Sequence, residues 1–371
     1  MKNESKDTTP RPDQPVEIAG AGLSGLTAAI TLAHRGRRVV VHERGRDAGS
    51  RFHEDFQGLE NWTSATDVLD ELAGLGIEPD FEHTPFREVV LFGPSGQSYR
   101  FTAERPIFYL VRRGIEPGTL DQALKAQALA AGAELRFKSK VRHLRGGGVA
   151  ADGPHRADAV AAGYLFRTGA PDGAYVAVSE RLAPKGYAYL LICRGRATLA
   201  SCLFADFHNE RRYVERAVAF FREHVGVEPE GGVRFGGAGN FGLPPRRHSA
   251  TALIRPAGEN AGFQDALLGF GMRYAVLSGA AAGRSLAEGE DSAWPRTVTR
   301  RLHGEMAASI FNRWVYERLG DRGYEHALRY YHGSGRDAIR CPASAYAARP
   351  WKPGPRSDPL VVGRGYHSIL L

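Results

Sequence analysis

The feature that most constrains this chain is a glycine-rich turn between two apolar strands near its N-terminus. Residues 16–43 have the order strand, Gly-x-Gly-x-x-Gly turn, helix and strand, and they end in Glu43. Gly20 allows a tight turn, Gly22 lets the backbone approach a pyrophosphate, and Gly25 lets the helix lie close on the sheet. Glu43 has about the spacing of an acid that accepts ribose hydroxyls. The unit therefore predicts a dinucleotide site.

The residues around the glycines support this interpretation. An apolar strand over residues 16–19 precedes them, and one face of the predicted helix carries Leu26, Ala29, Ile30 and Ala33. The free N–H groups and the dipole at the start of this helix favour a bound phosphate. The motif is common to NAD and FAD sites, but its place near the chain start and the later segments favour FAD.

Composition bounds the class of protein. The chain has 371 residues, enough for about two domains, and its 43% apolar and 24% charged content is typical of soluble globular proteins. No apolar run reaches the ~20 residues of a transmembrane segment. Residues 1–15 are polar and lack the apolar core of a signal peptide, so we expect a disordered tail and a cytoplasmic protein.

The net charge of +8 has several possible consequences. It could favour an anionic substrate, an acidic redox or carrier protein, or an anionic membrane surface, or it could be only a solvated arginine-rich surface. The arginines are spread along the chain, so no nucleic acid is expected as a partner.

Three cysteines, Cys193, Cys202 and Cys341, are too few and too scattered for a disulfide framework or a metal site, and we expect none. Cys193 and Cys202 fall in one predicted hairpin, where they could be a redox pair or two buried thiols.

The order of predicted elements indicates two interleaved domains of mixed α/β (α+β) class, with a C-terminal helical segment. Helices are expected near residues 65–75, 120–131, 210–224, 271–287, 301–319 and 323–331, and hairpins at 87–102 and 186–204. Thr119 and Gln122 predict a capping box. A Rossmann-like cofactor domain would hold residues 16–85, 106–162 and 245–300. A β-sheet substrate domain would hold 86–105 and 163–244, followed by helices and an extended tail over 301–371.

Two later motifs add to the first. Asp152-Gly153 follows an apolar strand, and Gly258-Glu259 is followed by Gly269-Phe270-Gly271 at the start of a helix. In this order the three motifs resemble those of FAD-dependent oxidoreductases of the hydroxybenzoate-hydroxylase fold, and most closely the geranylgeranyl reductase branch. Arg112-Arg113 and the segment from Ala183 to Tyr189 add to the likeness, which spans residues 16 to about 290.

The resemblance implies roles for individual residues. Arg44 and Arg112 would lie along the pyrophosphate or adenine side, Asp152 would support the middle of FAD, and Gly269 to Gly271 would face the flavin ring. The full set implied for the cofactor is Gly20, Ala21, Gly22, Leu23, Ser24, Gly25, Glu43, Arg44, Arg51, Arg112, Asp152, Gly153, Gly258, Glu259, Gly269, Gly271 and Met272.

The sequence departs from the family pattern at two points that bear on function. The family has Gly-Asp where this chain has Gly258-Glu259, and the additional methylene displaces the carboxylate. The family's Trp-x-Phe-Pro is Tyr189-Leu190-Leu191-Ile192 here, so a prenyl-lipid substrate does not follow from the resemblance.

The expected activity is transfer of hydride from reduced flavin to a C=C bond of a small organic or lipid-like substrate. NAD(P)H or a ferredoxin would be a transient electron donor. Two alternatives stay open: a flavin-dependent monooxygenase using NAD(P)H and O₂, and a FAD-binding isomerase, cyclase or scaffold without redox turnover. Tyr187 and Tyr189, which alternation places on one face of a strand, are candidate catalytic residues. His53, with Glu54 and Asp55, is a candidate acid or base in the loop after Glu43.

Overall fold

A computed structural model describes residues 14–141, 143–144, 147–244, 254–288 and 292–333 of the chain. The predicted tails before residue 14 and after residue 333, together with Cys341, lie outside these ranges. Within them, no helix is long and apolar enough to cross a membrane.

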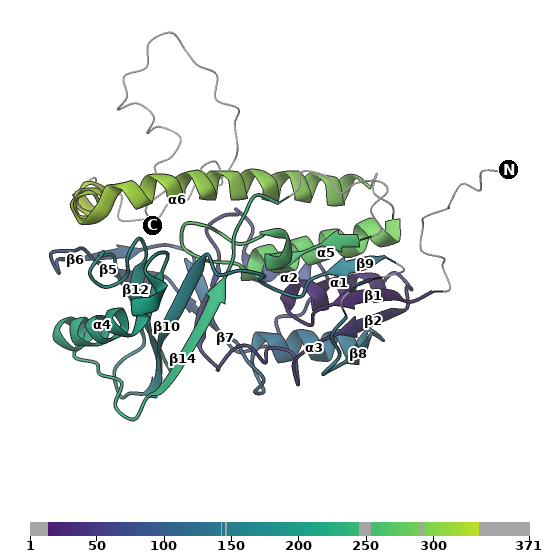
Figure 1. The fold of residues 1–371 in the computed structure, drawn as a ribbon, viewed down its shortest axis with the longest axis horizontal. Helices are drawn as coiled ribbons and strands as arrows, with labels where there is room; N and C mark the ends of the chain where they lie inside the picture. The colour runs from purple at the N-terminus through teal and green to yellow at the C-terminus, as the bar shows by residue number, and fades with distance from the viewer. Residues whose placement is uncertain (1–13, 142, 145–146, 245–253, 289–291, 334–371) are drawn as a thin grey trace, which may run out of the picture.

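The first layer is a parallel sheet of five strands, which includes the two strands of the glycine unit (Figure 1). All of its strand pairs are parallel, and Val16 to Ala19 align with Val39 to His42. In spatial order its strands are β15 (Ile254–Pro256), β9 (Gly148–Ala150), β1 (Val16–Ala19), β2 (Val39–His42) and β8 (Glu134–Arg136). This arrangement brings the ends of β1, β9 and β15 together at one sheet edge, as expected of a Rossmann-like fold.

Helices cover this sheet and form its apolar core. They are α1 (Leu23–Ala33), α2 (Val68–Ala73), α3 (Leu120–Ala130) and α5 (Met272–Glu288). Helix α5 lies against α1 because its contact face carries glycines: a Cβ on Gly279 would lie 2.2 Å from the Ser24 carbonyl oxygen, and one on Gly283 3.0 Å from that of Ala28. The small residues of α5 thus let the two helices pack closely, with the start of α1 against the middle of α5.

The second layer is a seven-stranded sheet, antiparallel except between β11 and β5. Its spatial order is β14 (Val233–Gly239), β10 (Ala159–Arg167), β13 (Arg196–Leu203), β12 (Tyr187–Cys193), β11 (Gly173–Ala177), β5 (Glu88–Phe92) and β6 (Ser98–Thr102). The predicted domain boundary at residue 162 falls inside β10. The assignment of cofactor and substrate roles to these layers stays a prediction.

Alternation along β12 divides the large sheet into two faces. Ala188, Leu190 and Ile192 pack toward α4 (Glu210–Val225), which follows the short 3₁₀ helix η1 (Phe207–Asn209). Tyr189 and Leu191 pack on the opposite face. That face looks toward a three-stranded sheet of β3 (Phe56–Glu60), β7 (Phe108–Arg112) and β4 (His83–Phe86).

The C-terminal helix α6 (Ala293–Gly333) runs along both layers (Figure 1). The sequence predicted two helical stretches here, and the structure joins them at Gly320, whose φ of 55° and ψ of −174° are not helical. Ser309 on α6 donates to Asp265 at 2.5 Å, and Tyr316 donates to the Gly186 carbonyl at 2.7 Å. Helix α6 thereby binds the loop before α5 and the large sheet.

Two predictions of local structure need correction. Thr119 Oγ1 accepts from Gln122 N at 3.4 Å, but the Gln122 amide donates to the Ala48 carbonyl at 3.0 Å, so the reciprocal half of the capping box is absent. A redox pair of Cys193 and Cys202 is also wrong. Both are buried free thiols at opposite ends of the β12–β13 hairpin, where Cys193 is opposite Arg196 and Cys202 is opposite Tyr187.

Candidate functional site

The glycine turn has the geometry that its sequence predicted. Gly20 has φ of +100°, and a Cβ there would lie 2.2 Å from the Ala151 carbonyl oxygen. A Cβ on Gly25 would lie 1.9 Å from the Gly20 carbonyl oxygen, so α1 sits directly on the turn. Gly22 differs, because a Cβ there would meet no atom within 4 Å. Gly20 and Gly25 therefore serve packing of the chain, whereas Gly22 leaves open space.

The acid at the end of β2 faces the same turn. Glu43 accepts hydrogen bonds from Ala21 N at 2.8 Å and from Gly45 N at 2.6 Å, one on each carboxylate oxygen. A carboxylate has about four lone-pair sites, so each oxygen can still accept a further donor such as a hydroxyl. Glu43 therefore holds the turn in place and can still accept a hydrogen bond from a bound molecule.

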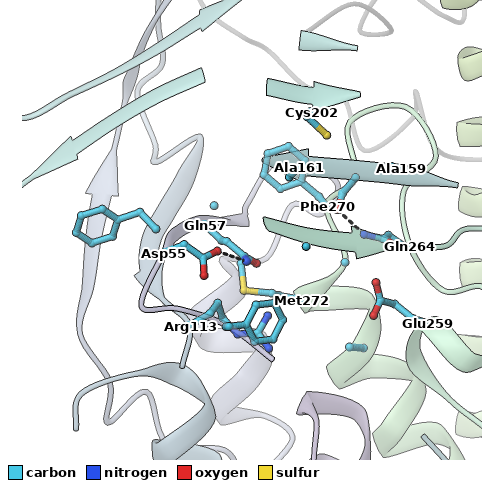
Figure 2. Close-up of a pocket in the computed structure, with 18 of the residues that line it drawn as sticks. Asp55, Gln57, Arg113, Ala159, Ala161, Cys202, Glu259, Gln264, Phe270 and Met272 are labelled. Carbon is cyan, nitrogen blue, oxygen red and sulfur yellow. Dashed lines mark hydrogen bonds between the residues drawn. The ribbon is translucent and has the colours of Figure 1, made fainter. Parts of the chain in front are cut away.

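A cavity of about 410 Å³ starts at this turn and extends to the inner face of the large sheet (Figure 2). Its turn end is lined by Ala21, Gly22, Leu23, Ser24, Glu43 and Arg44. Its sheet end is lined by Val89, Leu91, Phe101, Ile107, Phe108, Ala174, Val176, Val178 and Leu191. One continuous space therefore joins a polar end, where backbone N–H groups are near, to an apolar end.

Charged side chains meet in the middle of the cavity. Arg51 Nη1 lies 2.7 Å from Glu259 Oε2, which makes an ion pair. Asn260 donates to Asp152 at 2.5 Å, next to Gly153, which lines the cavity. Glu259, which stands in the place of the family aspartate, is therefore neutralised by Arg51.

Residue Gly258 makes the close approach of two turns possible. It begins the 3₁₀ helix η2 (Gly258–Ala261), has φ of +62°, and a Cβ there would lie 2.4 Å from Ser24 Oγ. Its N–H donates to Ser278 Oγ on α5 at 2.9 Å. This contact places Glu259 beside the start of α1.

The loop before α5 presents glycine to the cavity. Gly269 has φ of +79° with no atom within 4 Å of a Cβ position, and Gly271 and Met272 also line the space. The side-chain amide of Gln264 donates to the Gly269 carbonyl at 2.9 Å. Asp265 accepts from Leu268 N at 2.6 Å and from Ser309, and burial raises its pKa.

The structure corrects the placement of one arginine. Arg112 donates to Glu82 at 2.9 and 3.0 Å, to Glu54 at 3.1 Å and to the Pro117 carbonyl, and it does not line the cavity. Its neighbour Arg113 lines the cavity and binds Asp121 through two hydrogen bonds of 2.8 Å. Arg112 ends β7 and Arg113 follows it, and the two side chains point to different sides. The pair Arg112-Arg113 in the sequence did not indicate which one faces inward.

The three candidate catalytic residues all line the cavity. Tyr187 donates its hydroxyl to the Leu268 carbonyl, whereas no described residue is within hydrogen-bonding distance of the Tyr189 hydroxyl. Burial raises the pKa of both phenols well above the ordinary value, and the charge of Asp55 adds to the effect on Tyr189. His53 is exposed and contacts Phe235, with ring centroids 6.4 Å apart.

Sequence reasoning passed over part of this site. Asp55 is only 4% exposed and lines the cavity, where it accepts from Gln57 Nε2 at 2.7 Å and from His53 N at 3.1 Å (Figure 2). The sequence indicates Asp55 only as one of three adjacent charged residues in this loop, and it gives no signal for Gln57. Glu54, the other candidate acid or base next to His53, forms an ion pair with Arg112 instead.

Comparison with known proteins finds similarity over parts of this chain. A family model of an NAD(P)-binding Rossmann-like domain matches residues 18–59. A digeranylgeranylglycerophospholipid reductase of Methanocaldococcus jannaschii is 28% identical over 126 residues, which are 33% of this chain and 28% of that protein. A FAD-dependent monooxygenase of Aspergillus niger is 36% identical over 110 residues, which are 27% of this chain and 24% of that protein. Each match thus spans less than a third of the relative's length.

A solved structure matches most of the fold. A geranylgeranyl bacteriochlorophyll reductase-like protein from Thermoplasma acidophilum superposes with a TM-score of 0.66 at 17% identity, covering 85% of this chain and 90% of that one. At this identity the likeness concerns the fold. The chain therefore carries a Rossmann-like dinucleotide domain and has the fold of the FAD-dependent reductases and monooxygenases, as the sequence resemblance predicted.

Proposed function

We propose that this chain is a FAD-dependent oxidoreductase that reduces a C=C bond of a small organic or lipid-like substrate. The observation that carries the proposal is the single cavity that joins the glycine turn at Gly22 to the apolar face of the large sheet at Leu191. When bound, reduced flavin would supply the hydride for this chemistry.

The shape and the donors of the cavity fit FAD. Gly22 and Gly269 both border open space that a Cβ would enter. Backbone N–H groups at the start of α1 would meet the pyrophosphate, and Glu43 would accept ribose hydroxyls. Arg51, Asp152 and Glu259 would lie along the middle of the cofactor, with Gly269 to Met272 beside the ring.

The residues at the sheet end would exclude water and supply a proton. Valines, leucines and phenylalanines line this end and exclude water from a reacting double bond. Reduction of an alkene also requires a proton, and Tyr189, which lines the cavity, holds one on its hydroxyl. A phenol is protonated at neutral pH and can act as a donor. Burial raises the pKa of Tyr189 and makes it a weaker acid than an ordinary tyrosine, so the proton would move only as negative charge develops on the carbon that receives it.

A second candidate is a monooxygenase that adds one oxygen atom from O₂. The similarity to a FAD-dependent monooxygenase favours it, as does the apolar sheet end, because a water-free pocket also suits this chemistry. The two reactions would use the same cofactor site.

Purified protein tests both proposals. We expect it to be yellow, to be bleached anaerobically by NADPH or by reduced ferredoxin, and to recover its colour in air. Incubation with candidate alkenes under nitrogen should give products heavier by two hydrogen atoms. Consumption of O₂ with products heavier by one oxygen atom would support the monooxygenase instead. Colourless protein that gains no flavin on soaking would contradict both.

A further inference from the structure

Several polar side chains of the cavity lining stand beside its apolar sheet end, and two of them have unused hydrogen-bonding capacity. Asp55 precedes β3, and Tyr189 lies on β12, and both line the space. Their side chains come from different layers of the molecule, so any molecule that fills this end must lie between or against them. What these two groups can bind indicates what the substrate carries.

The position of Asp55 is fixed by the large sheet. The amide of Phe56 donates to Thr198 Oγ1 on β13 at 2.9 Å, in a buried contact. Thr198 is opposite Leu191 on β12, and Ala200, two residues further along the same face, is opposite Tyr189. Thr198 and Tyr189 are therefore diagonal neighbours, which lie about 7–8 Å apart. Asp55, next to Phe56, is thus held on the side of the sheet where Tyr189 lies, and its charge acts on the Tyr189 phenol.

The unused hydrogen-bonding capacity of the pair is complementary to a hydroxyl group. Asp55 accepts two hydrogen bonds, one on each oxygen, so about two of its four lone-pair sites remain. Tyr189 has a hydroxyl that no described residue contacts by a hydrogen bond. Asp55 can therefore accept a hydrogen bond from a ligand, while the Tyr189 hydroxyl can donate one to it. Arg113 also lies near Asp55, but it already makes two hydrogen bonds of 2.8 Å with Asp121. An anionic group beside Asp55 would therefore meet a carboxylate whose neighbouring cation is already engaged.

We propose that Asp55 and Tyr189 form a hydroxyl-binding pair that selects an apolar substrate with one neutral hydroxyl and rejects its carboxylate analogue. This inference rests on the proposed function, because it assigns the sheet end of the cavity to the substrate. It narrows the substrate class from anionic or lipid-like molecules to uncharged apolar molecules with a hydrogen-bond donor.

The test compares three flat apolar probes by isothermal titration calorimetry with the flavin-loaded protein. They are 2-naphthol, its methyl ether 2-methoxynaphthalene, and 2-naphthoate. We expect 2-naphthol to bind about ten-fold more tightly than the ether, because a hydrogen bond to a charged group is lost in the ether. The carboxylate should bind most weakly.

Two variants assign the preference to the pair. Asp55→Asn should bring the naphthol-to-ether ratio towards one and strengthen naphthoate binding. Tyr189→Phe should instead weaken the binding of both naphthol and ether, because both have an oxygen that accepts from this hydroxyl, and should leave their ratio nearly unchanged. Tyr330→Phe and Asp80→Asn change exposed residues outside the cavity and should keep the ratio of the unaltered protein.

Four outcomes would overturn the inference: no binding of 2-naphthol by folded protein, equal affinity for naphthol and ether, a ratio unchanged in Asp55→Asn, or unchanged affinity for both probes in Tyr189→Phe. Failure of the proposed function is a separate result. It is seen as absence of retained flavin in the same preparation, where the three probes can still be titrated because Asp55 and Tyr189 are held by the protein itself.

Discussion

Tyr187 donates its hydroxyl to the carbonyl oxygen of Leu268, which joins the inner face of the large sheet to the loop before α5. Gly269, which follows Leu268, borders the cavity with no atom within 4 Å of a Cβ position. The backbone of this loop is thus held by the large sheet. Tyr187 is accordingly a positioning residue, while Tyr189, two residues along the strand, has a free hydroxyl to offer a ligand.

Replacing Tyr187 with phenylalanine tests this positioning role. The change leaves the Leu268 carbonyl without its side-chain donor and should lower the free energy of unfolding by about 1 kcal/mol. If the loop orients flavin, the absorbance spectrum and the reduction potential of bound flavin should shift as well. Tyr330→Phe, on an exposed tyrosine, is the matched control. An unchanged spectrum and stability would show that the loop is held by Asp265 and Gln264 alone.

Two glycines of the same motif should respond in opposite ways to substitution. A Cβ on Gly22 would enter open space, so Gly22→Val should fold with a loss of about 1 kcal/mol as a poorer helix N-cap. The new methyl groups would occupy the path of the pyrophosphate, and flavin affinity should fall by at least about ten-fold. Thermal unfolding and flavin titration measure the two effects separately.

Gly25→Ala is the counterpart. Its Cβ would lie 1.9 Å from the Gly20 carbonyl oxygen, and neither backbone can move without separating α1 from the sheet. We expect this smaller substitution to prevent stable folding, which circular dichroism would show. Retention of flavin by Gly22→Val, or normal stability of Gly25→Ala, would contradict the geometry of the turn.

The adjacent arginines at the end of β7, Arg112 and Arg113, also separate into two roles. Arg113→Met would leave the fully buried Asp121 without its cation, which should cost about 3–5 kcal/mol. Arg112→Met should cost about 1 kcal/mol, because its partners Glu82 and Glu54 are 50% and 40% exposed and can be hydrated. Flavin retention should fall only in the Arg113 variant. A larger loss of flavin in Arg112→Met would restore the role that the sequence first implied.

The parts of the site that the sequence predicted are those fixed within a short stretch of chain. Gly25 lies against Gly20 and against Ile18 of β1, so the spacing of the two glycines carries this contact. Likewise the face shared by Tyr187 and Tyr189 follows from strand alternation. These features require no knowledge of how distant segments pack.

The parts that the sequence did not predict depend on contacts between distant segments. Asp55 reaches the cavity because Phe56 binds Thr198, 142 residues away. The reciprocal half of the capping box is lost because Gln122 finds the Ala48 carbonyl, 74 residues away. In each case a tertiary partner competes with the local one, and a local pattern carries no information about that partner.

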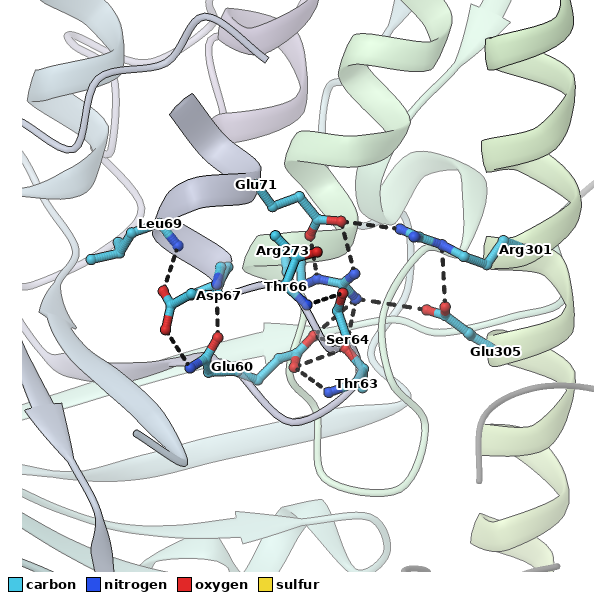
Figure 3. A network of polar contacts seen from close by, with 12 residues as sticks. Glu60, Thr63, Ser64, Thr66, Asp67, Leu69, Glu71, Arg273, Arg301 and Glu305 are labelled. Atoms are coloured by element: carbon cyan, nitrogen blue, oxygen red, sulfur yellow. Dashed lines mark hydrogen bonds and ion pairs between the residues drawn. The ribbon is translucent and has the colours of Figure 1, made fainter. Parts of the chain in front are cut away.

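The buried charge cluster around Arg273 is another contact between distant segments that the sequence did not predict (Figure 3). Arg273 follows Met272 at the start of α5 and pairs with Glu71 at 2.6 Å, Glu60 at 3.4 Å and Glu305 at 3.8 Å. Arg301 on α6 adds a second cation, 3.4 Å from Glu71 and from Glu305. Three carboxylates thus face two guanidinium groups, and the cluster is electrically balanced when one carboxyl is protonated.

Glu305 is the carboxyl whose protonation should be visible in stability. Burial raises its pKa from the ordinary 4.5 to about 7, against the attraction of Arg273 and Arg301. Between these two pH values the folded protein holds a proton that the unfolded chain has lost, so the free energy of unfolding should fall as the pH rises from about 4.5 to 7. Burial raises the pKa of Glu60 in the same direction.

Glu305→Gln removes this dependence at one position while it keeps the shape of the side chain. Above pH 7 the variant should be as stable as the unaltered protein or more so, because a desolvated charge is lost and Glu60 and Glu71 still balance the two arginines. Its stability should also fall less steeply between pH 4.5 and 7, with the remaining slope due partly to Glu60. Urea unfolding across this range measures both effects, and Glu223→Gln, at an exposed position of α4, should leave the slope unchanged. A variant that loses several kcal/mol at pH 8 would instead show that ionised Glu305 is needed to hold α6 on Arg273.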